Sequence, residues 1–297
     1  MSENDTPNSW RPGLLIRRAA DRLAAAGLPS PMVDARVLLA YVLDVEPVAL
    51  ATISTVPAGD AARFLDLVRQ RAQWVPVQHL TGMAYFRHEK LHVGPGVFLP
   101  RPETELLVQL VIDWLAKRNV AAPVIVDLGT GSGAIAKALA RESCATVHAI
   151  EASQEAFTYA RRNIGRSIDL RLGSWTNAFA DLNGSVDVVV SNPPYVPVGT
   201  DLPADVCRFD PPDALFAGAD GLDCLREVVD VAARLLHPGG LLACEHDESH
   251  GLTAPGVIAD NGRFVDIVDH NDLTGRARYV TAELGPLKLW RDLVVGS

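Results

Sequence analysis

An apolar stretch that runs into three closely spaced glycines carries the first chemical signal in this 297-residue chain. Residues Val124 to Asp127 are typical of a buried strand, and Gly129, Gly131 and Gly133 follow before a helix expected to start near Ala134. Glycines permit a tight turn and let a ligand approach bare backbone, while the start of a helix offers unpaired N–H groups. The pattern predicts a ligand-binding turn, and its structural alternative is a plain strand-turn-helix joint.

Two carboxylates bear on which ligand would fit this turn. The spacing Gly129-x-Gly131-x-x-Ala134 also matches a dinucleotide pattern, and Glu151, 22 residues after Gly129, could take ribose hydroxyls in either case. Asp127 would lie near a dinucleotide's pyrophosphate and repel it, whereas S-adenosylmethionine carries an ammonium and a sulfonium and no phosphate. We therefore favour S-adenosylmethionine, with S-adenosylhomocysteine as product, over a dinucleotide or a purely structural turn.

An apolar strand that ends in Asn192-Pro-Pro-Tyr195 carries the second signal. Pro193 and Pro194 remove two backbone donors and stiffen the loop, so the Asn192 side chain and nearby carbonyls are held as acceptors that can bind an NH2 group. Because ligands of open α/β sheets bind at the carboxyl ends of the strands, we expect this loop beside the glycine loop. The structural alternative is a rigid strand exit in which Tyr195 is ordinary packing.

The chemistry suited to these acceptors is methyl transfer to a planar nitrogen. An amide or aromatic amine nitrogen is a poor nucleophile because its lone pair is delocalised. If Asn192 Oδ1 and the Pro193 carbonyl each accept one N–H, the lone pair is aimed at the methyl group, and both bonds strengthen as the nitrogen gains positive charge. In-line positioning supplies most of the remaining acceleration, and Tyr195 is expected to pack on the flat face of the substrate group.

The elements that must position these residues alternate regularly in the second part of the chain. Helices are expected at 103–117, 134–141, 154–164 and 222–236, and strands at 124–127, 146–150, 169–172, 186–190, 241–244, 264–269 and 277–284. Strands that are apolar almost throughout, alternating with helices, indicate a mainly parallel sheet covered on both faces. The last strand follows its predecessor across the short stretch 271–275, which favours an antiparallel pair.

The first part of the chain has a different pattern. Apolar residues recur at helical spacing between residues 14 and 74, which predicts a small all-α helical bundle. Segments 85–87 and 91–93 could pair as a hairpin that links two domains. We therefore expect a helical bundle in residues 1–80, a β-hairpin linker in 81–101 and a doubly wound, Rossmann-like α/β domain in 102–297.

Composition restricts the partners and the compartment. The chain has 27 Lys and Arg against 36 Asp and Glu, net charge −9, while residues 1–90 carry net +1; the acidity therefore lies in the second part and disfavours nucleic acid. The four cysteines form no C-x-x-C pair, so we expect reduced thiols in a cytoplasmic protein. Residues 1–10 show no secretion signal, and no apolar run is long enough to predict a membrane span.

Two further stretches are candidates for a function. His246 and His250 are four residues apart, but the order His-Asp-Glu-Ser-His differs from the metalloprotease pattern His-Glu-x-x-His, so we expect a solvated polar loop and no metal. The stretch 196–212 is long, polar and rich in proline for a connection inside a compact domain. It predicts a lid on the substrate side, with an ordinary surface excursion as the alternative.

The glycine loop and the Asn-Pro-Pro-Tyr loop together resemble the amino-methyltransferases that act on adenine N6, cytosine N4 or glutamine N5. Residues 97–105, Val-Phe-Leu-Pro-Arg-Pro-Glu-Thr-Glu, look like the signature of the release-factor glutamine N5-methyltransferases, the PrmC/HemK family. The likeness continues through residues 127–133, 192–195, 209–223 and 272–276, in the family's order and over nearly the whole chain.

The resemblance implies a seven-stranded methyltransferase domain that methylates the glutamine of the Gly-Gly-Gln loop in class I peptide chain release factors, with the helical domain binding the release factor. Carried over by position, the cofactor residues are Asp127, Gly129, Thr130, Gly131, Ser132, Gly133, Glu151, Trp175 and Asn192. Trp175 would lie against the adenine. The catalytic and glutamine-binding group would be Asn192, Pro193, Pro194 and Tyr195, and Phe98 would help to wall the substrate slot.

Two departures from the family pattern leave alternatives open. The family usually has an acidic residue where this chain has Ser174, and tends towards Glu-Ile-Gly where this chain reads Glu245-His-Asp. The alternative functions are a nucleic-acid adenine N6-methyltransferase, a ribosomal-protein glutamine methyltransferase and a binding module without turnover. Only the first would need a basic groove and salt-sensitive binding of nucleic acid.

Overall fold

The computed structural model describes residues 9–286, and these form two compact units. One unit is helical and contains the residues up to 83 together with 204–209; the other contains residues 84–203 and those from 210 onward. The outer parts of the expected domains, residues 1–8 and 287–297, lie outside the described residues. None of the helices within residues 9–286 has the length and apolar character needed to cross a membrane.

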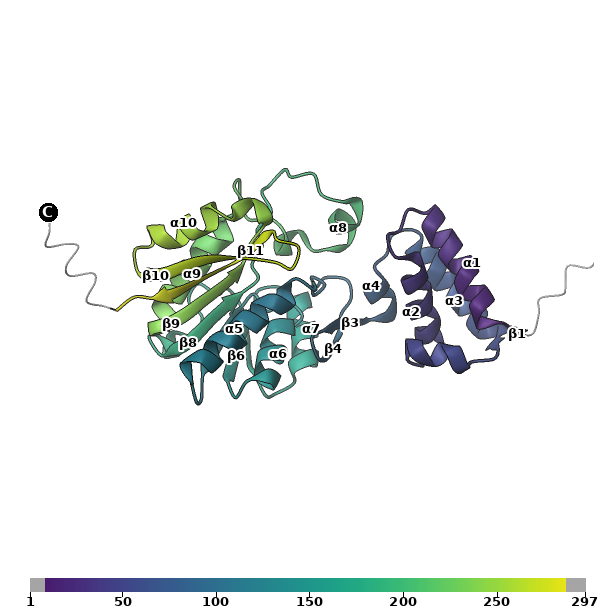
Figure 1. Cartoon of the computed structure of the whole chain (residues 1–297), viewed down its shortest axis with the longest axis horizontal. Helices are drawn as coiled ribbons and strands as arrows, with labels where there is room; N and C mark the ends of the chain where they lie inside the picture. The colour runs from purple at the N-terminus through teal and green to yellow at the C-terminus, as the bar shows by residue number, and fades with distance from the viewer. Residues whose placement is uncertain (1–8, 287–297) are drawn as a thin grey trace, which may run out of the picture. The chain divides into compact units, whose positions relative to one another are not determined.

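The helical unit confirms the bundle expected from the apolar spacing (Figure 1). Its elements are β1 (Ser9–Trp10), α1 (Pro12–Ala25), α2 (Pro31–Leu43), η1 (Pro47–Thr52), β2 (Val56–Pro57), α3 (Ala58–Arg71) and α4 (Val77–Thr81). Helices α1 and α2 begin with a proline, whose fixed φ suits the first turn and whose missing N–H would have no helical partner there. Leu23, Leu38 and Phe64 are buried where these helices meet.

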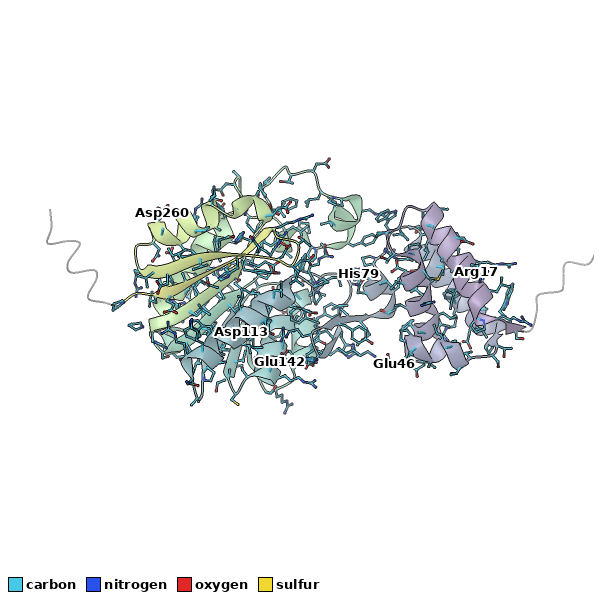
Figure 2. The ribbon with its side chains drawn as sticks, viewed as in Figure 1. Arg17, Glu46, His79, Asp113, Glu142 and Asp260 are labelled. Atoms are coloured by element: carbon cyan, nitrogen blue, oxygen red, sulfur yellow. The ribbon has the colours of Figure 1, made fainter. Side chains whose placement is uncertain are left out.

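A short helix from a distant part of the sequence belongs to this unit. Helix α8 (Ala204–Phe209) lies within the stretch 196–212, yet Arg208 Nη1 donates to the Gln73 carbonyl at 3.3 Å. The Phe209 and His79 rings pack edge-on, with their centres 6.3 Å apart; His79 is labelled in Figure 2. The stretch 196–212 therefore contains a helix and is more than an irregular connection.

The second unit is built on a seven-stranded sheet. Its strands are β5 (Val124–Leu128), β6 (Thr146–Glu151), β7 (Asp169–Leu172), β8 (Val186–Ser191), β9 (Leu236–Glu245), β10 (Phe264–Asn271) and β11 (Ala277–Leu284). Their order is β10-β11-β9-β8-β5-β6-β7, and β11 is antiparallel to both of its neighbours while the pairs from β9 to β7 are parallel. The expected α/β class and the antiparallel last strand are confirmed.

Helices cover both faces of the sheet, as the apolar strands predict (Figure 1). The principal helices are α5 (Thr104–Arg118), α6 (Ala134–Glu142), α7 (Gln154–Ile164), α9 (Asp223–Leu235) and α10 (Thr253–Asp260). Core residues of α5, α6 and α7 pack together with β3 (Met83–Phe86) and β4 (Glu89–His92), a two-stranded sheet at the expected hairpin. Core residues of α9 and α10 pack on the opposite face.

Strand β9 is longer than its sequence predicts, because it begins at Leu236 rather than at 241. The intervening His-Pro-Gly-Gly reads as a break, yet Leu236 pairs with Val186 and the register shifts before Leu241 pairs with Val188. A Cβ on Gly240 would lie 3.0 Å from the Val186 carbonyl oxygen, so only glycine fits where the strand bulges.

Candidate functional site

The two loops with predicted chemistry follow neighbouring parallel strands. Strand β5 pairs with β6 on one side and with β8 on the other. The strand order reverses between β5 and β8, and the glycine loop and Asn192 follow these two strands at that point. Ligands of such sheets bind at this point, outside the carboxyl ends of the strands. The Ser191 hydroxyl donates to the Leu128 carbonyl at 2.7 Å and ties the two strand ends together.

The glycine loop needs glycine at all three positions, for two different reasons. Gly129, Gly131 and Gly133 have φ of 72°, 57° and 84°, in the left-handed region that other residues rarely adopt. A Cβ on Gly133 would lie 2.8 Å from Ile164 Cγ2, and one on Gly129 would lie 3.0 Å from the Trp175 ring. No atom lies within 4 Å of the corresponding position on Gly131, so this glycine borders open space.

Asp127 holds the loop from beneath. Its side chain is completely buried, and Oδ2 accepts hydrogen bonds from Thr130 Oγ1 at 2.6 Å and from the Ala136 amide at 3.1 Å. Its other oxygen, Oδ1, is buried without a hydrogen-bond partner among the described residues. Burial raises the pKa of Asp127 to about 7. A buried carboxylate with an unsatisfied oxygen suits a site that receives a cationic ligand and repels a phosphate.

The raised pKa of Asp127 predicts a pH-dependent stability. Because its pKa in the folded protein, about 7, exceeds the ordinary 3.8, the folded state takes up a proton between these values and loses stability as pH rises through about 7. We expect the free energy of unfolding of Asp127→Asn to improve relative to the unsubstituted protein by about 2 kcal/mol between pH 5 and pH 8. Urea unfolding of the ligand-free proteins at both pH values measures this difference.

The control for this titration is Asp66→Asn, which removes a carboxylate from the exposed face of α3. The Arg69 guanidinium lowers the pKa of Asp66 from its ordinary 3.8, so Asp66 is ionised at both pH values and its replacement adds no pH dependence. A constant stability difference between Asp127→Asn and the unsubstituted protein from pH 5 to pH 8 would contradict the raised pKa of Asp127.

Glu151 closes the other side of the glycine loop from the end of β6. Its Oε2 accepts the Gly131 amide and its Oε1 accepts the Ser153 amide, both at 2.8 Å. An ionised carboxylate has about four lone-pair positions, so two oxygens that each hold one amide retain capacity for two more donors. This remaining capacity is compatible with the vicinal hydroxyls of a ribose, and the cofactor role of Glu151 stays a prediction.

Trp175 packs on the glycine loop, where its ring meets Gly129. Its Nε1 donates to Glu227 Oε2 on α9 at 2.8 Å, which fixes the plane of the indole. The neighbouring Ser174 is occupied locally, because its Oγ lies 3.0 Å from Thr176 Oγ1. Ser132, another predicted cofactor residue, is buried, and its carbonyl accepts Asn163 Nδ2 at 2.8 Å.

The Asn192 side chain is anchored by residues far away in sequence. Asn192 Nδ2 donates to Thr104 Oγ1 at 3.1 Å, and Thr104 Oγ1 donates to Glu245 Oε2 at 2.7 Å. The Tyr195 hydroxyl lies 3.5 Å from Glu245 Oε1, so one carboxylate contacts Tyr195 directly and is linked to Asn192 through Thr104. Burial and the Glu245 charge raise the pKa of Tyr195, which keeps its phenol neutral. Sequence reasoning assigned no role to Thr104 or Glu245.

A second pair of residues supports the loop from behind. The chain after Tyr195 is held by a β-bridge between Val196 and Phe216. Gly221 lies so close to Tyr195 that a Cβ added at Gly221 would be 2.4 Å from the Tyr195 carbonyl oxygen. The same Cβ would lie 3.0 Å from the ring of His250, whose Nε2 lies 3.1 Å from the Asp220 carbonyl oxygen. Gly221 and His250 are therefore packing residues of this loop.

The prediction of a solvated loop at 246–250 is wrong for its two histidines. His246 is buried, with Nε2 2.8 Å from Asp269 Oδ2, and His250 is buried behind Gly221. Arg278 on β11 contacts His246, and Asp220 and Gly221 contact His250; the local sequence of five polar residues does not reveal these contacts. Within residues 9–286 no group of three or more His, Cys, Asp or Glu side chains is arranged to hold a metal ion.

Phe98 lies in the loop before α5 and contacts a charged pair. The Arg101 guanidinium carbon lies 4.9 Å from the centre of the Phe98 ring, and Arg101 Nη2 donates to the buried Asp210 carboxylate at 2.6 Å. A cation over an aromatic face stabilises both groups and holds the ring in place. The 97–105 signature thus contributes both Phe98 and, six residues later, the Thr104 that anchors Asn192.

Comparisons with known proteins give the family of this chain. Residues 15–82 match a family described as the PrmC N-terminal domain, and residues 90–207 match one described as the methyltransferase small domain. The release factor glutamine methyltransferase of Streptomyces coelicolor is 47% identical over 90% of this chain and 96% of its own length. Its namesake from Mycolicibacterium smegmatis is 43% identical over 90% and 95%.

A third relative bears a different name. The 4-amino-L-phenylalanine/4-methylamino-L-phenylalanine methyltransferase of Streptomyces pristinaespiralis is 39% identical over 84% of this chain and 87% of its own length. The sheet order, the two loops at neighbouring strand ends and near full-length identity above 40% all agree with one assignment. The chain belongs to the release factor glutamine methyltransferase family, whose S-adenosylmethionine-dependent transferase domain here follows a helical PrmC-type domain.

Proposed function

We propose that this enzyme transfers the methyl group of S-adenosylmethionine to the N5 amide nitrogen of the glutamine in the Gly-Gly-Gln motif of class I peptide chain release factors. The observation that carries the proposal is the anchored Asn192 side chain. Its Nδ2 donates a hydrogen bond to Thr104, and the adjacent Ser191 is bonded to the strand that leads into the glycine loop. Its Oδ1 is therefore the end of the amide available to accept an N–H. Full-length likeness to release factor glutamine methyltransferases supports glutamine as the acceptor.

S-adenosylmethionine supplies an electrophilic methyl group when it is bound. Among this chain's residues, Gly129, Gly131 and Gly133 leave room for close approach, and Glu151 has capacity for two hydroxyl donors. Trp175 presents an indole face fixed by Glu227, suited to an adenine ring. Thr130 and Ser132 shape the same turn, and Asp127 places a buried negative charge beneath it.

The glutamine amide is activated by orientation. Asn192 Oδ1 and the Pro193 carbonyl accept its two N–H groups, and Pro194 adds no competing donor. These bonds strengthen as the nitrogen becomes positively charged, so they stabilise the transition state more than the ground state. No strong base is needed before transfer, because the proton can leave afterwards. Tyr195 packs on the flat face of the amide, and Phe98 walls the slot.

The helical unit is the part of the chain that we assign to recognition of the release factor. It matches the PrmC N-terminal domain, and residues 1–90 carry a net charge of only +1, in contrast to the acidic transferase part. We place the stretch 196–212 on the substrate side as a lid, and we place the reaction in the cytoplasm, with no membrane or nucleic-acid partner. The domain limits of 1–80, 81–101 and 102–297 belong to this proposal.

The decisive experiment is peptide mass spectrometry of an unmodified release factor after incubation with the enzyme and S-adenosylmethionine. We expect a single added methyl group, 14 mass units, on the Gly-Gly-Gln glutamine. Parallel reactions offer an oligonucleotide and free 4-amino-L-phenylalanine, the substrate named for one relative. Methylation of the oligonucleotide or the free amino acid with an untouched release factor would replace the proposal, and no transfer to any acceptor would favour a binding module.

A further inference from the structure

We propose that Thr104 and Glu245 are positioning residues that decide which end of the Asn192 amide faces the substrate, an inference that rests on the proposed function. An asparagine amide has an oxygen that accepts and a nitrogen that donates, and the two are nearly equal in size. Only the oxygen can hold the N–H of an acceptor nitrogen. Asn192 therefore needs a neighbour that distinguishes its two ends.

The three side chains form a hydrogen-bonded relay in this unit, in which Thr104 and Glu245 are buried and Asn192 is half-buried. Thr104 and Glu245 are 4% and 2% exposed, and the distances along the relay are 3.1 Å from Asn192 Nδ2 to Thr104 Oγ1 and 2.7 Å from there to Glu245 Oε2. Helix α5 supplies Thr104 in its first turn, β9 supplies Glu245 as its last residue, and Asn192 follows β8. Three separate elements thus converge on one hydroxyl group.

The charge of Glu245 determines the direction of the hydrogen bonds. An ionised carboxylate has no proton to donate, so Thr104 must give its single hydroxyl proton to Glu245. The Thr104 oxygen can then act towards Asn192 only as an acceptor, which selects Nδ2 and leaves Oδ1 for the substrate. If Glu245 is protonated, it can itself donate to Thr104, whose own proton becomes available to Asn192 Oδ1, and the amide can turn its nitrogen to the substrate.

The surroundings of Glu245 bring this change into an accessible pH range. Burial raises the pKa of Glu245 to about 7, and the nearby charge of Glu103 acts in the same direction. The Thr104 hydrogen bond, the positive charge of Arg278 and the Tyr195 hydrogen bond oppose the rise.

Three other ionisable side chains near Glu245 are not expected to change charge near pH 7. On β11, Tyr279 pairs with Glu245 in the sheet, is buried, and donates its hydroxyl to the Glu103 carbonyl. On β9, burial holds the pKa of the Cys244 thiol well above its ordinary value, so this thiol stays neutral. Asp247 has a lowered pKa, with hydrogen bonds from Ser249, and stays ionised near pH 7. Glu245 is thus the member of this group expected to titrate there.

The first test measures kcat and KM for release-factor methylation between pH 6 and pH 8. We expect kcat of the unsubstituted enzyme, measured at saturating S-adenosylmethionine, to fall about tenfold from pH 8 to pH 6. Thr104→Val, which keeps the shape and removes the hydroxyl, should lower kcat at pH 8 about tenfold or more and abolish the pH dependence. Glu245→Gln should also give a flat profile, whereas Thr104→Ser should restore both rate and profile.

The matched control is Tyr279→Phe, which removes a buried hydroxyl from the strand beside Glu245 and leaves the Asn192–Thr104–Glu245 relay intact. We expect it to lower stability and to keep the pH profile of the unsubstituted enzyme. The inference would be overturned by a Thr104→Val enzyme with kcat within twofold of the unsubstituted value, or by residual activity that still falls tenfold between pH 8 and pH 6.

A second measurement does not depend on turnover. In protein labelled with ¹⁵N-asparagine, the Asn192 side-chain amide signal, assigned by its loss in Asn192→Ala, should shift with a midpoint near pH 7. An Asn192 signal that stays constant from pH 6 to pH 8 would overturn the inference. If the release factor remains unmethylated while this signal titrates, the acceptor assignment fails and the relay stands.

Discussion

Replacement of Asn192 by alanine is expected to lower kcat for glutamine methylation by about 10²–10³-fold, while the Kd for S-adenosylmethionine changes by less than about threefold. The variant removes the side-chain acceptor that we place on the substrate amide and leaves the Pro193 carbonyl in position. The hydrogen bonds of Glu151 to the glycine loop and of Trp175 to Glu227 do not involve Asn192. Single-turnover methylation and calorimetric titration of S-adenosylmethionine measure the two quantities separately.

The control for this loss is Asn261→Ala, at the end of α10, where Asn261 Nδ2 donates to Asp230. It removes one asparagine hydrogen bond of the same kind away from both loops, and we expect kcat to stay within twofold. An Asn192→Ala enzyme with nearly full activity would show that the amide is oriented by other groups. Parallel loss of cofactor binding and thermal stability would indicate instead that Asn192 serves the fold.

Replacement of glycines in the loop after β5 is the second change with a large expected effect. Gly133→Ala should lower the free energy of unfolding by about 2–3 kcal/mol. It would force an alanine into the left-handed φ of 84° and place its Cβ only 2.8 Å from Ile164 Cγ2. Gly133 directly precedes α6, so the backbone of the glycine loop must shift to separate the new Cβ from Ile164. The affinity for S-adenosylmethionine should therefore fall about tenfold or more. Urea unfolding and cofactor titration check both effects.

Gly131→Ala separates the conformational effect from the collision. Its φ of 57° is also left-handed, but its Cβ would meet no atom within 4 Å, so the stability loss should be only about 1 kcal/mol. The new methyl group would occupy the open space that we assign to the cofactor, so loss of affinity should equal or exceed that of Gly133→Ala. Equal stability losses in both variants would contradict this account.

The control glycine lies outside the loop. Gly256 is inside helix α10 and has open space around its Cβ position, so Gly256→Ala should be neutral or slightly stabilising, by up to about 1 kcal/mol, with unchanged cofactor affinity. A comparable loss of cofactor affinity in this variant would mean that general destabilisation, rather than the loop itself, governs binding.

Local patterns in the sequence were sufficient for most of the fold. The limits of α7, β7 and β11 agree with the expected ranges residue for residue, because each is an apolar or amphipathic run bounded by turn residues. The antiparallel final strand followed from the short turn before it. Strand β9 was the main exception, since its first part runs through a Pro-Gly-Gly stretch that is paired only because β8 lies beside it.

The two loops of the candidate site were also evident in the sequence, because glycines, prolines and an asparagine at a strand end have distinctive backbone and side-chain chemistry. Their adjacency followed from the rule that parallel strands present their carboxyl ends at one edge. The burial of His246 and His250 and the grouping of α8 with the helical unit depended instead on segments distant in sequence. No local pattern reports such contacts.

The sequence by itself therefore determined the class of reaction, through the glycine loop, Asp127 and Asn192-Pro-Pro-Tyr195. The tertiary structure alone decided how Asn192 is held, by bringing Thr104, 88 positions away, onto its amide and Glu245, 53 positions away, onto the Thr104 hydroxyl. The physical reason is that a hydrogen-bond relay and the raised pKa of Glu245 depend on burial and on distances across three elements. Residue type and spacing along one element carry no information about either.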